Sequence, residues 1–389
     1  VERAMNNTKD HSGIVNVLSL LLALFLIKEY YAMFDVRNVK NVYSLLQIRN
    51  PPFLCAILIL VGARSVLQFA KANVACLIVS EILIYYLIYT RTYGIVSCNT
   101  ALLSMINFMK LYSYIAETRK NDAVTRNEPP IKENNTNTCA NVHQHERITE
   151  DRRNDVPAPE FTYFIRFLFL PTLCFLDATR YRKRSVSALF YNLIMASLLF
   201  SLVNFLVAFY IIPLLECYTI RDFVTDLTVF VRISATSFVI WVAMFLFFFK
   251  YYLSFLAECT NYENKIFGDW WNARYFRDFW RLWNIPTHEW LRRYVFFPCY
   301  RVIESKWTCT LIVFVISSIL HEIVYILTFK KVGVVVFMSI LSQFVFIYLE
   351  QVLFSPGNLL FWFVFCFIGQ PVFLLSIRKR FLEIVLIKA

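Results

Sequence analysis

The chain has 389 residues, of which 58% are hydrophobic, 18% are aromatic and only 17% are charged. A soluble domain of this size cannot hide so much apolar surface, so the composition argues against a soluble enzyme, a disordered chain and a disulfide scaffold. The net charge of +12 is spread between apolar stretches rather than gathered in one basic domain, which argues against nucleic acid as a partner. We therefore predict an all-α, polytopic membrane protein.

Nine stretches are apolar enough to cross a bilayer, which takes about 20 residues of helix. In chain order the predicted spans are Ile14–Phe34, Phe53–Ala70, Val74–Thr90, Gly94–Tyr114, Ser187–Ile212, Phe223–Phe255, Thr308–Phe329, Val332–Phe354 and Leu359–Ile377. The sixth is longer than a bilayer requires, so it must tilt or extend beyond the membrane.

Residues 117–160 are rich in Asn, Thr, Arg and Glu and nearly free of large apolar side chains. This composition predicts a polar, disordered cytosolic loop. His143 and His145 form an H-x-H pair in it, but no further ligands cluster beside them. The ten cysteines include no C-x-x-C pair, so we predict no metal site. Apart from this loop, we expect residues 1–389 to form a single integral-membrane domain.

Two basic regions set the predicted orientation, because Lys and Arg collect in cytosolic loops. One is Arg180–Arg184 and the other is the segment 257–307. Two predicted spans separate these regions, so both can face the cytosol. The basic tail Arg378–Arg380 does not fit this placement, because three further spans carry it to the opposite side.

The segment 257–307 holds six of the eight tryptophans. At helical spacing, aromatic rings gather on one of its faces and charges on the other. The first face consists of Asn272, Phe276, Phe279, Trp280 and Trp283, and the second of Arg274, Arg277, Asp278 and Arg281. This pattern predicts a cytosolic amphipathic helix in the headgroup plane, with its rings facing acyl chains. A helix that only anchors the protein explains the same periodicity, and this alternative stays open.

His321 is the only one of the five histidines that lies inside a predicted span. Ionisable groups at bilayer depth are costly and mark functional sites by default. Glu322 follows directly, and Ser317 and Tyr325 stand one helical turn to either side. We expect a buried, neutral imidazole that can accept a proton. A histidine that only joins two helices by hydrogen bonding is the alternative.

The sequence I-F-G-D-W-W-N at Ile266–Asn272 resembles the F-Y-x-D-W-W-N motif of the sterol and diacylglycerol acyltransferase branch of membrane-bound O-acyltransferases. It departs from that motif at Ile266 and Phe267, where the family has Phe and Tyr. Further blocks resemble the type-1 diacylglycerol acyltransferases and follow in the same order. They are Lys110–Tyr114, Leu170–Cys174, Trp283–Pro286 with His288 and Trp290, Ser305–Trp307, Gly357–Asn358 and Ile368–Pro371.

The resemblance implies the membrane-bound O-acyltransferase fold, with His321 as general base. This base would deprotonate the free hydroxyl of diacylglycerol, whose oxygen would attack the thioester of a fatty acyl-CoA. Asn284 and Glu322 are implied as further catalytic groups. The implied substrate-binding residues are Gln370, Ser317 and Gln343 in the reaction chamber, His288, Lys306 and Trp280 along the acyl-CoA tunnel, and Trp283 with Asp269, Trp270, Trp271 and Asn272.

The same resemblance implies the partners and the location of the protein. Fatty acyl-CoA, diacylglycerol and membrane lipid are the implied partners, a homo-oligomer stays open, and the endoplasmic reticulum membrane is the implied location. No cofactor is implied, because acyl-CoA is a co-substrate.

Several other functions fit part of the sequence. A sterol O-acyltransferase shares the D-W-W-N core, although the W-N-I-P and I-G-Q-P blocks favour diacylglycerol as acceptor. A wax-forming or broad-specificity acyltransferase stays open as well. From other classes, a membrane transporter is disfavoured by the lack of apparent internal repeats. A non-catalytic lipid-binding scaffold is disfavoured by the presence of Asp269, Asn284, His321 and Glu322.

Overall fold

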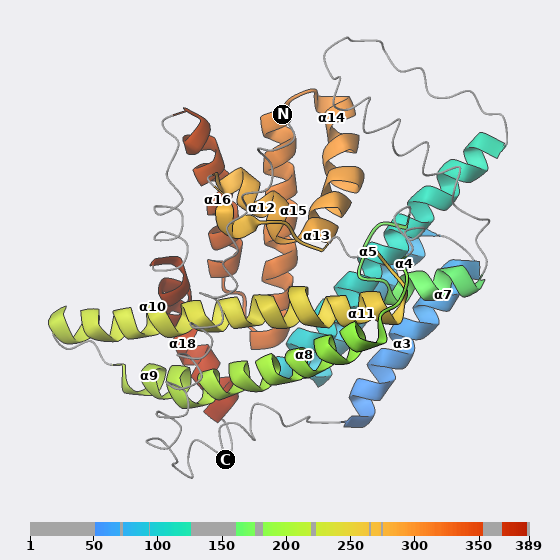
Figure 1. The fold of residues 1–389 in the computed structure, drawn as a ribbon. Coiled ribbons are helices and arrows are strands. Elements are labelled where there is room, and N and C mark those ends of the chain that lie inside the picture. Colours follow the sequence, from blue (N-terminus) through green and yellow to red (C-terminus); the bar gives the residue numbers. More distant parts are fainter. Residues whose placement is uncertain are drawn as a thin grey trace, which may run out of the picture.

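The computed structural model describes residues 51–70, 73–92, 94–125, 161–175, 182–218, 223–263, 266–273, 275–352 and 368–386. Within these ranges every regular element is a helix, which confirms the predicted all-α class (Figure 1). The α-helices are α3 (Pro51–Ala70), α4 (Val74–Arg91), α5 (Gly94–Thr125), α7 (Phe161–Phe169), α8 (Val186–Leu206), α9 (Ile212–Cys217), α10 (Phe223–Phe245), α11 (Leu253–Cys259), α12 (Phe276–Trp283), α13 (Ile285–Leu291), α14 (Phe297–Ile303), α15 (Lys306–Phe329), α16 (Val335–Val352) and α18 (Gln370–Leu386). Three π-helical turns, η3 (Val207–Ile211), η4 (Leu246–Tyr252) and η6 (Arg292–Phe296), and a 3-10 turn, η5 (Trp270–Asn272), complete the set.

Five of the described helical stretches are long and apolar enough to cross a membrane. They are Phe53–Ala70, Val74–Arg91, Val186–Glu216, Leu227–Cys259 and Lys306–Phe329. A sixth apolar helix, Val335–Gln351, is shorter. The predicted span Gly94–Tyr114 is helical within α5, although α5 is not among the five. Ile14–Phe34 lies outside the described residues, and Leu359–Ile377 lies only partly within them.

Helix α5 does not end where the polar loop was predicted to begin. It continues from Glu117 to Thr125, so the first part of the predicted loop is helical. The prediction fails there because Glu117 is buried against other parts of the chain rather than exposed. Residues 126–160, the remainder of the predicted loop, lie outside the described residues.

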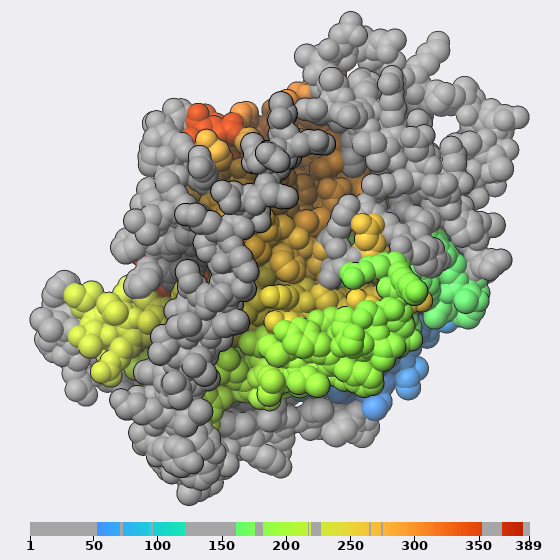
Figure 2. Space-filling model, viewed as in Figure 1, coloured from blue at the N-terminus to red at the C-terminus, as the bar shows by residue number. Residues whose placement is uncertain are grey.

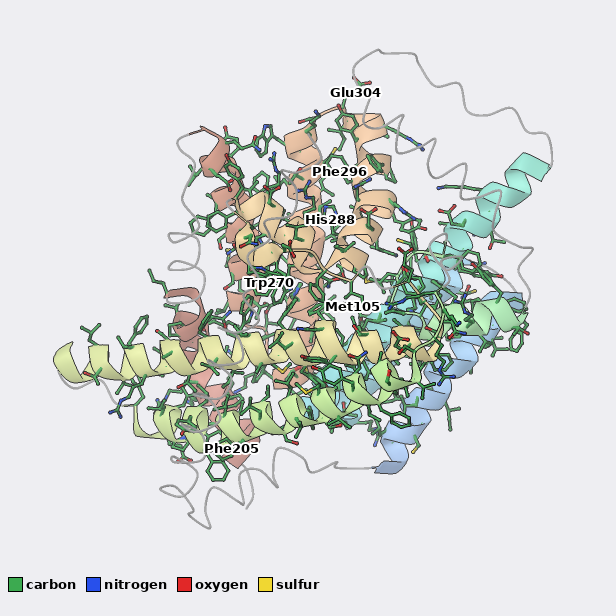
Figure 3. All side chains as sticks on the ribbon, viewed as in Figure 1. Met105, Phe205, Trp270, His288, Phe296 and Glu304 are labelled. Atoms are coloured by element: carbon green, nitrogen blue, oxygen red, sulfur yellow. The ribbon has the colours of Figure 1, made fainter. Side chains whose placement is uncertain are left out.

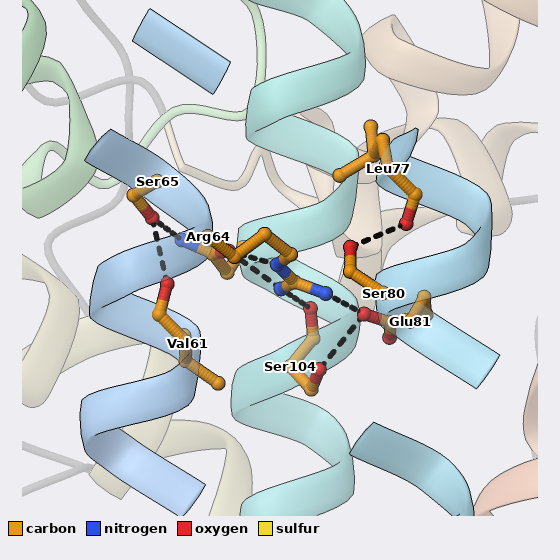
Figure 4. Close-up of polar contacts among 8 residues, drawn as sticks. Val61, Arg64, Ser65, Leu77, Ser80, Glu81 and Ser104 are labelled. Carbon is orange, nitrogen blue, oxygen red and sulfur yellow. Dashed lines mark hydrogen bonds and ion pairs between the residues drawn. The ribbon is translucent and has the colours of Figure 1, made fainter. Parts of the chain in front are cut away.

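A buried polar network joins α3, α4 and α5 (Figure 4). Arg64 of α3 forms an ion pair with Glu81 of α4, and both side chains are almost fully buried. The Arg64 guanidinium also donates to Asn107 Oδ1 and to the carbonyl oxygen of Ser104, both on α5. The Ser104 hydroxyl donates to Glu81 at 2.9 Å. Because unpaired charges inside a membrane are very costly, this pairing fixes the three helices relative to one another.

Helix α15 stands in the middle of the bundle (Figure 1). It packs against α16 in a helical hairpin and against α4, α5, α14 and η6. At its end, Lys330 has a left-handed backbone and donates its ammonium group to the Ile88 carbonyl of α4 at 2.9 Å. Helices α8 and α10 lie side by side beneath this hairpin in the view of Figure 1. Of the predicted site residues, α15 carries Lys306, Ser317, His321 and Glu322.

The Trp-rich segment 257–307 contains several short helices. It comprises the end of α11, then η5, α12, α13, η6 and α14, and the first two residues of α15. Asn284 between α12 and α13 has non-helical dihedral angles, and Pro286 just after it lacks a backbone N–H, so α12 cannot continue. Helix α12 shows the predicted two faces, with Phe276 buried and Arg277 exposed.

The aromatic face of α12 packs on other rings of the protein. The prediction that these rings face the acyl chains of the lipid bilayer is therefore wrong. Trp283 stacks on Trp241 of α10 with ring centroids 4.6 Å apart and planes 9° apart. Phe276 stacks on Phe346 of α16, with a centroid distance of 5.3 Å. In the space-filling view, the gold surface of this region lies recessed between α8 and the elements around α15 (Figure 2).

Candidate active site

His321 lies in the second half of α15, and one of its ring nitrogens is engaged by the helix itself. Its Nδ1 is 2.7 Å from the carbonyl oxygen of Ser317, one turn earlier. A carbonyl oxygen can only accept a hydrogen bond, so Nδ1 must carry the proton of this bond. In a neutral ring the lone pair then resides on Nε2. The geometry therefore presents Nε2 as the proton-accepting atom.

The His321 side chain is exposed rather than buried, which contradicts the expectation of a ring shielded by apolar neighbours. The expectation fails because hydropathy along one helix does not show which of its residues the neighbouring helices cover. An exposed imidazole can be reached by a substrate beside α15. The Ser317 carbonyl, and not burial, thus determines which nitrogen of the neutral ring carries the proton.

Glu322 is buried, and both of its carboxylate oxygens are directed to the start of α16. Oε1 accepts hydrogen bonds from the backbone N–H groups of Gly333 and Val334 at 2.9 and 2.8 Å. Oε2 accepts one from Phe337 at 3.1 Å. The first N–H groups of a helix have no partner within it, and a carboxylate placed there satisfies them. Glu322 therefore fastens the α15–α16 hairpin next to His321.

Asn284 is the N-cap of α13. Its Oδ1 accepts a hydrogen bond from the backbone N–H of Thr287 at 3.1 Å, and its carbonyl accepts one from His288. This is the usual role of Asn at a helix start, and it fixes the angle between α12 and α13. Its side-chain NH₂ group can still donate to a substrate carbonyl.

Trp280 connects α12 to the helix of His321. Its ring meets that of Phe314 on α15 edge to face, with the centroids 6.4 Å apart. Phe314 and His321 lie two turns apart on α15, about 10 Å along the helix axis. An aromatic surface therefore extends from α12 toward the histidine.

His288 lies on α13, outside the predicted spans, among charged neighbours. Burial lowers the pKa of His288 below its ordinary value, and Arg292 and Arg281 act in the same direction. Glu289, with an oxygen 3.9 Å from His288 Nδ1, opposes this shift but does not outweigh burial. Figure 3 shows the segment continuing outward from His288 past Phe296 to Glu304. Lys306, the first residue of α15, is exposed.

The D-W-W-N residues form η5 and the turn before it. Trp270 is buried, whereas Asp269, Trp271 and Asn272 are exposed. Together with α10 and η4, the two tryptophans line an open apolar pocket of about 470 Å³. Its described lining residues are Phe238, Val242, Phe245, Leu246, Trp270 and Trp271. The structure thus places Trp270 and Trp271 against α10 and η4.

Two glutamines predicted to line the chamber lie on helices that contact each other. Gln343 on α16 donates to the Ser339 carbonyl at 3.4 Å. Its Oε1 is buried without a hydrogen-bond partner among the described residues. Gln370 is the first residue of α18, which packs on both α15 and α16. A buried amide oxygen left unpaired is a candidate acceptor for a ligand group.

No group of three or more His, Cys, Asp or Glu side chains that could hold a metal ion occurs in the part of the chain that the structure describes. Glu350, a half-buried carboxylate on α16 that contacts α12, is not among the residues predicted from the sequence. A signal was present, because an acidic residue inside the predicted span Val332–Phe354 is as unusual as His321 in its own span.

Comparison with known proteins identifies the family of the chain. The sequence model of the membrane-bound O-acyltransferase family matches residues 18–377. Diacylglycerol O-acyltransferase 1 of Arabidopsis thaliana is 30% identical over 237 residues, 56% of this chain and 45% of that protein. Diacylglycerol O-acyltransferase 1-1 of Oryza sativa subsp. japonica is 32% identical over 243 residues, 59% of this chain and 45% of that protein.

A third relative is matched over nearly the whole chain. Diacylglycerol O-acyltransferase 1 of Dictyostelium discoideum is 27% identical over 379 residues, 94% of this chain and 55% of that protein. The chain spans about half the length of the relatives it matches. The family match covers most of the chain, and it agrees with the apolar helices of the structure. This chain belongs to the membrane-bound O-acyltransferase family.

Proposed function

We propose that this protein transfers a fatty acyl group from acyl-CoA to the free hydroxyl of diacylglycerol, producing triacylglycerol and free CoA. The observation that carries the proposal is the bond between His321 Nδ1 and the Ser317 carbonyl, which leaves Nε2 as the basic nitrogen. The similarity to proteins named diacylglycerol O-acyltransferase supports the choice of reaction. Their name also supports diacylglycerol over a sterol or a fatty alcohol as the acceptor.

In this mechanism His321 acts as base and then as acid. Nε2 takes the hydroxyl proton of diacylglycerol while the hydroxyl oxygen attacks the carbonyl carbon of the thioester. The carbon–sulfur bond breaks when the tetrahedral intermediate collapses, and the departing CoA sulfur takes the proton from the imidazolium. General base catalysis contributes roughly 10²- to 10⁴-fold, so positioning and oxyanion stabilisation must supply the remainder.

Other residues are assigned roles in the same proposal. The side-chain NH₂ group of Asn284 and the amides of Gln343 and Gln370 are suited to bind the thioester carbonyl or the lipid ester groups. Ser317 holds the imidazole through its carbonyl. His288, Lys306 and Trp280 bind acyl-CoA, with the Lys306 ammonium suited to the CoA phosphates. Trp283, Asp269, Trp270, Trp271 and Asn272 shape the surrounding surface, and Glu322 keeps the hairpin of His321 in place.

The substrates imply a location and partners. Diacylglycerol reaches His321 from the membrane, and acyl-CoA approaches from the cytosolic side, where 257–307 is expected. We place the protein in the endoplasmic reticulum membrane, in keeping with the family resemblance. The reaction needs no cofactor, because acyl-CoA provides the activated acyl group.

The test is acyl transfer by membranes that contain the wild-type protein or His321→Ala. With radiolabelled oleoyl-CoA and diacylglycerol, we expect triacylglycerol from the wild type and a loss of at least about 100-fold in the variant. The variant should retain the wild-type melting temperature in detergent, because the exposed ring contributes little packing. Wild-type turnover by His321→Ala would exclude His321 as the base. Faster esterification of a sterol offered in competition would assign the protein to the sterol branch.

A further inference from the structure

Helix α12 begins with a cap that comes from a different helix. The backbone N–H of Phe276, the first residue of α12, donates to Oε2 of Glu350 on α16 at 2.8 Å. Tyr275, which precedes α12, provides no side-chain hydrogen bond as a cap. The opening N–H groups of a helix need an acceptor, and a carboxylate also interacts favourably with the positive end of the helix dipole. Glu350 therefore supplies the hydrogen-bond acceptor that Tyr275 does not provide.

A second contact lies one turn away on the same face of α16. The Phe276 ring stacks on Phe346 with planes 14° apart, and Phe276 is only 4% exposed. Residues 346 and 350 are four apart, so both side chains project toward α12. Phe276 is thus held to α16 both through its backbone and through its ring.

Helix α16 is in turn fastened to the helix of His321. Glu322 on α15 accepts the N–H groups of Gly333, Val334 and Phe337 at the start of α16. Glu350 lies 16 residues beyond Val334, about 24 Å along a helix, so it is far from that junction. The Glu322 carboxylate thus joins α15 to α16, and the Glu350 carboxylate joins α16 to α12.

The position of α12 determines the position of Trp280. This ring meets Phe314 of α15, whereas Trp283 stacks on Trp241 of α10. An α12 released at its first turn would pivot and move both rings. Under the proposed function, Trp280 belongs to the acyl-CoA site, so such a movement would weaken acyl-CoA binding and leave the proton transfer by His321 unchanged.

We propose that Glu350 is a positioning residue, which holds α12 against the His321 hairpin and thereby sets the affinity for the fatty acyl-CoA substrate. The assignment rests on the proposed function for its substrate, but the anchoring itself does not. Glu350 touches no reacting atom, and it acts through Phe276 and the orientation of α12.

The experiment compares Glu350→Ala with Glu350→Gln, because the amide oxygen of Gln can still accept the Phe276 N–H. In acyl-transfer assays we expect Glu350→Ala to raise the KM for oleoyl-CoA by roughly tenfold and to change kcat by less than about twofold. Glu350→Gln should lie within about threefold of the wild-type KM. An unchanged KM in the Ala variant, or an equal increase in both variants, would overturn the assignment.

A second measurement is independent of activity. Arg277 and Arg281 on the outer face of α12 are exposed, so trypsin cleavage after them reports release of the helix. Mass spectrometry of the detergent-solubilised full chain should show faster cleavage there for Glu350→Ala and wild-type rates for Glu350→Gln. Equal rates in all three proteins would overturn the anchoring. If Glu350→Ala does not fold, Glu350→Asp takes its place, because its carboxylate is one methylene shorter. We then expect a raised KM for oleoyl-CoA and faster trypsin cleavage in Glu350→Asp, and wild-type values of both would overturn the assignment.

The two proposals fail in distinguishable ways. Absence of acyl transfer by the wild type with every acceptor would remove the proposed function, and the trypsin comparison would still decide whether Glu350 anchors α12. If the wild-type protein transfers acyl groups and Glu350→Ala has an unchanged KM for oleoyl-CoA, only the positioning role of Glu350 is excluded.

Discussion

Tyr294 of η6 donates its hydroxyl to Oε1 of Glu117 near the end of α5, at a distance of 3.1 Å, and both side chains are buried. Nearby, the Trp290 indole N–H donates to the Met109 carbonyl at 2.8 Å. These two bonds attach the Trp-rich segment to α5. Burial and the Glu117 carboxylate raise the pKa of Tyr294, so its hydroxyl remains protonated and able to donate at neutral pH.

Replacing Tyr294 by Phe should therefore weaken this attachment. The ring keeps its packing, but the buried carboxylate of Glu117 loses a donor, which costs about 1–3 kcal/mol. We expect a lower melting temperature for detergent-solubilised Tyr294→Phe, measured by fluorescence-detected size exclusion. Glu117→Gln, which keeps an acceptor oxygen, should lose less. A melting temperature unchanged in Tyr294→Phe would mean that the bond contributes nothing to stability.

Gly333 is predicted to tolerate no side chain. A Cβ added there would lie 2.3 Å from Cε1 of Tyr325. That ring cannot retreat, because it is buried and its hydroxyl accepts a hydrogen bond from Arg380 at 2.6 Å. We expect Gly333→Ala to lose about 1–3 kcal/mol through overpacking.

Gly62 provides the matched control for this substitution. It lies inside α3, and no heavy atom would come within 4 Å of an added Cβ. Because Ala is about 1 kcal/mol better than Gly in a helix interior, Gly62→Ala should melt at or above the wild-type temperature. Equal effects of the two substitutions in the same thermal assay would contradict the steric argument.

Replacing Glu322 should lower the stability of the protein more than it lowers the rate of acyl transfer. Glu322→Ala leaves three backbone N–H groups at the start of α16 without their acceptor, at a cost of about 3 kcal/mol or more. Glu322→Gln keeps one oxygen and should be destabilised less. Melting temperature and kcat are measured for both variants. A Gln variant that melts like the wild type but has lost most of its kcat would instead show that Glu322 acts on His321 or on the substrate.

The environment of His288 predicts a sensitivity to acid. Because burial lowers its pKa in the folded protein, the unfolded chain binds the proton more readily than the folded chain does. The contribution of neutral His288 to the free energy of unfolding is fully present above about pH 6.5, the ordinary pKa of histidine. It is lost as the pH falls through the lowered pKa of the folded protein. We expect His288→Asn to lose less of its melting temperature between pH 7.5 and 5.5 than the wild type. Identical pH profiles would rule out this contribution.

The helices of the membrane part could be predicted because each depends on a continuous run of side chains. Lipid demands about 20 apolar residues and an internally satisfied backbone, and hydropathy along the sequence reports both conditions. The spans Phe53–Ala70 and Thr308–Phe329 were accordingly found within one or two residues of their observed bounds. The amphipathic pattern of α12 was visible for the same local reason.

The bonding of the charged groups could not be predicted, since their partners are distant in the chain. The basic tail conflicts with the predicted orientation of the membrane spans. In the structure, Arg378 donates to the Leu215 and Glu216 carbonyls at the end of α9, and Arg380 donates to Tyr325. These cations serve as hydrogen-bond donors within the protein, a role that a count of Lys and Arg in loops does not reveal.

The sequence by itself determined that this chain is helical, that it crosses a membrane and that a histidine lies within one span, because each property follows from neighbouring residues. Only the tertiary structure decided that the His321 ring is exposed, that the rings of α12 face protein instead of lipid, and that Glu350 caps a helix 74 residues away. Burial and hydrogen bonding depend on which helices meet, and local periodicity does not contain that information.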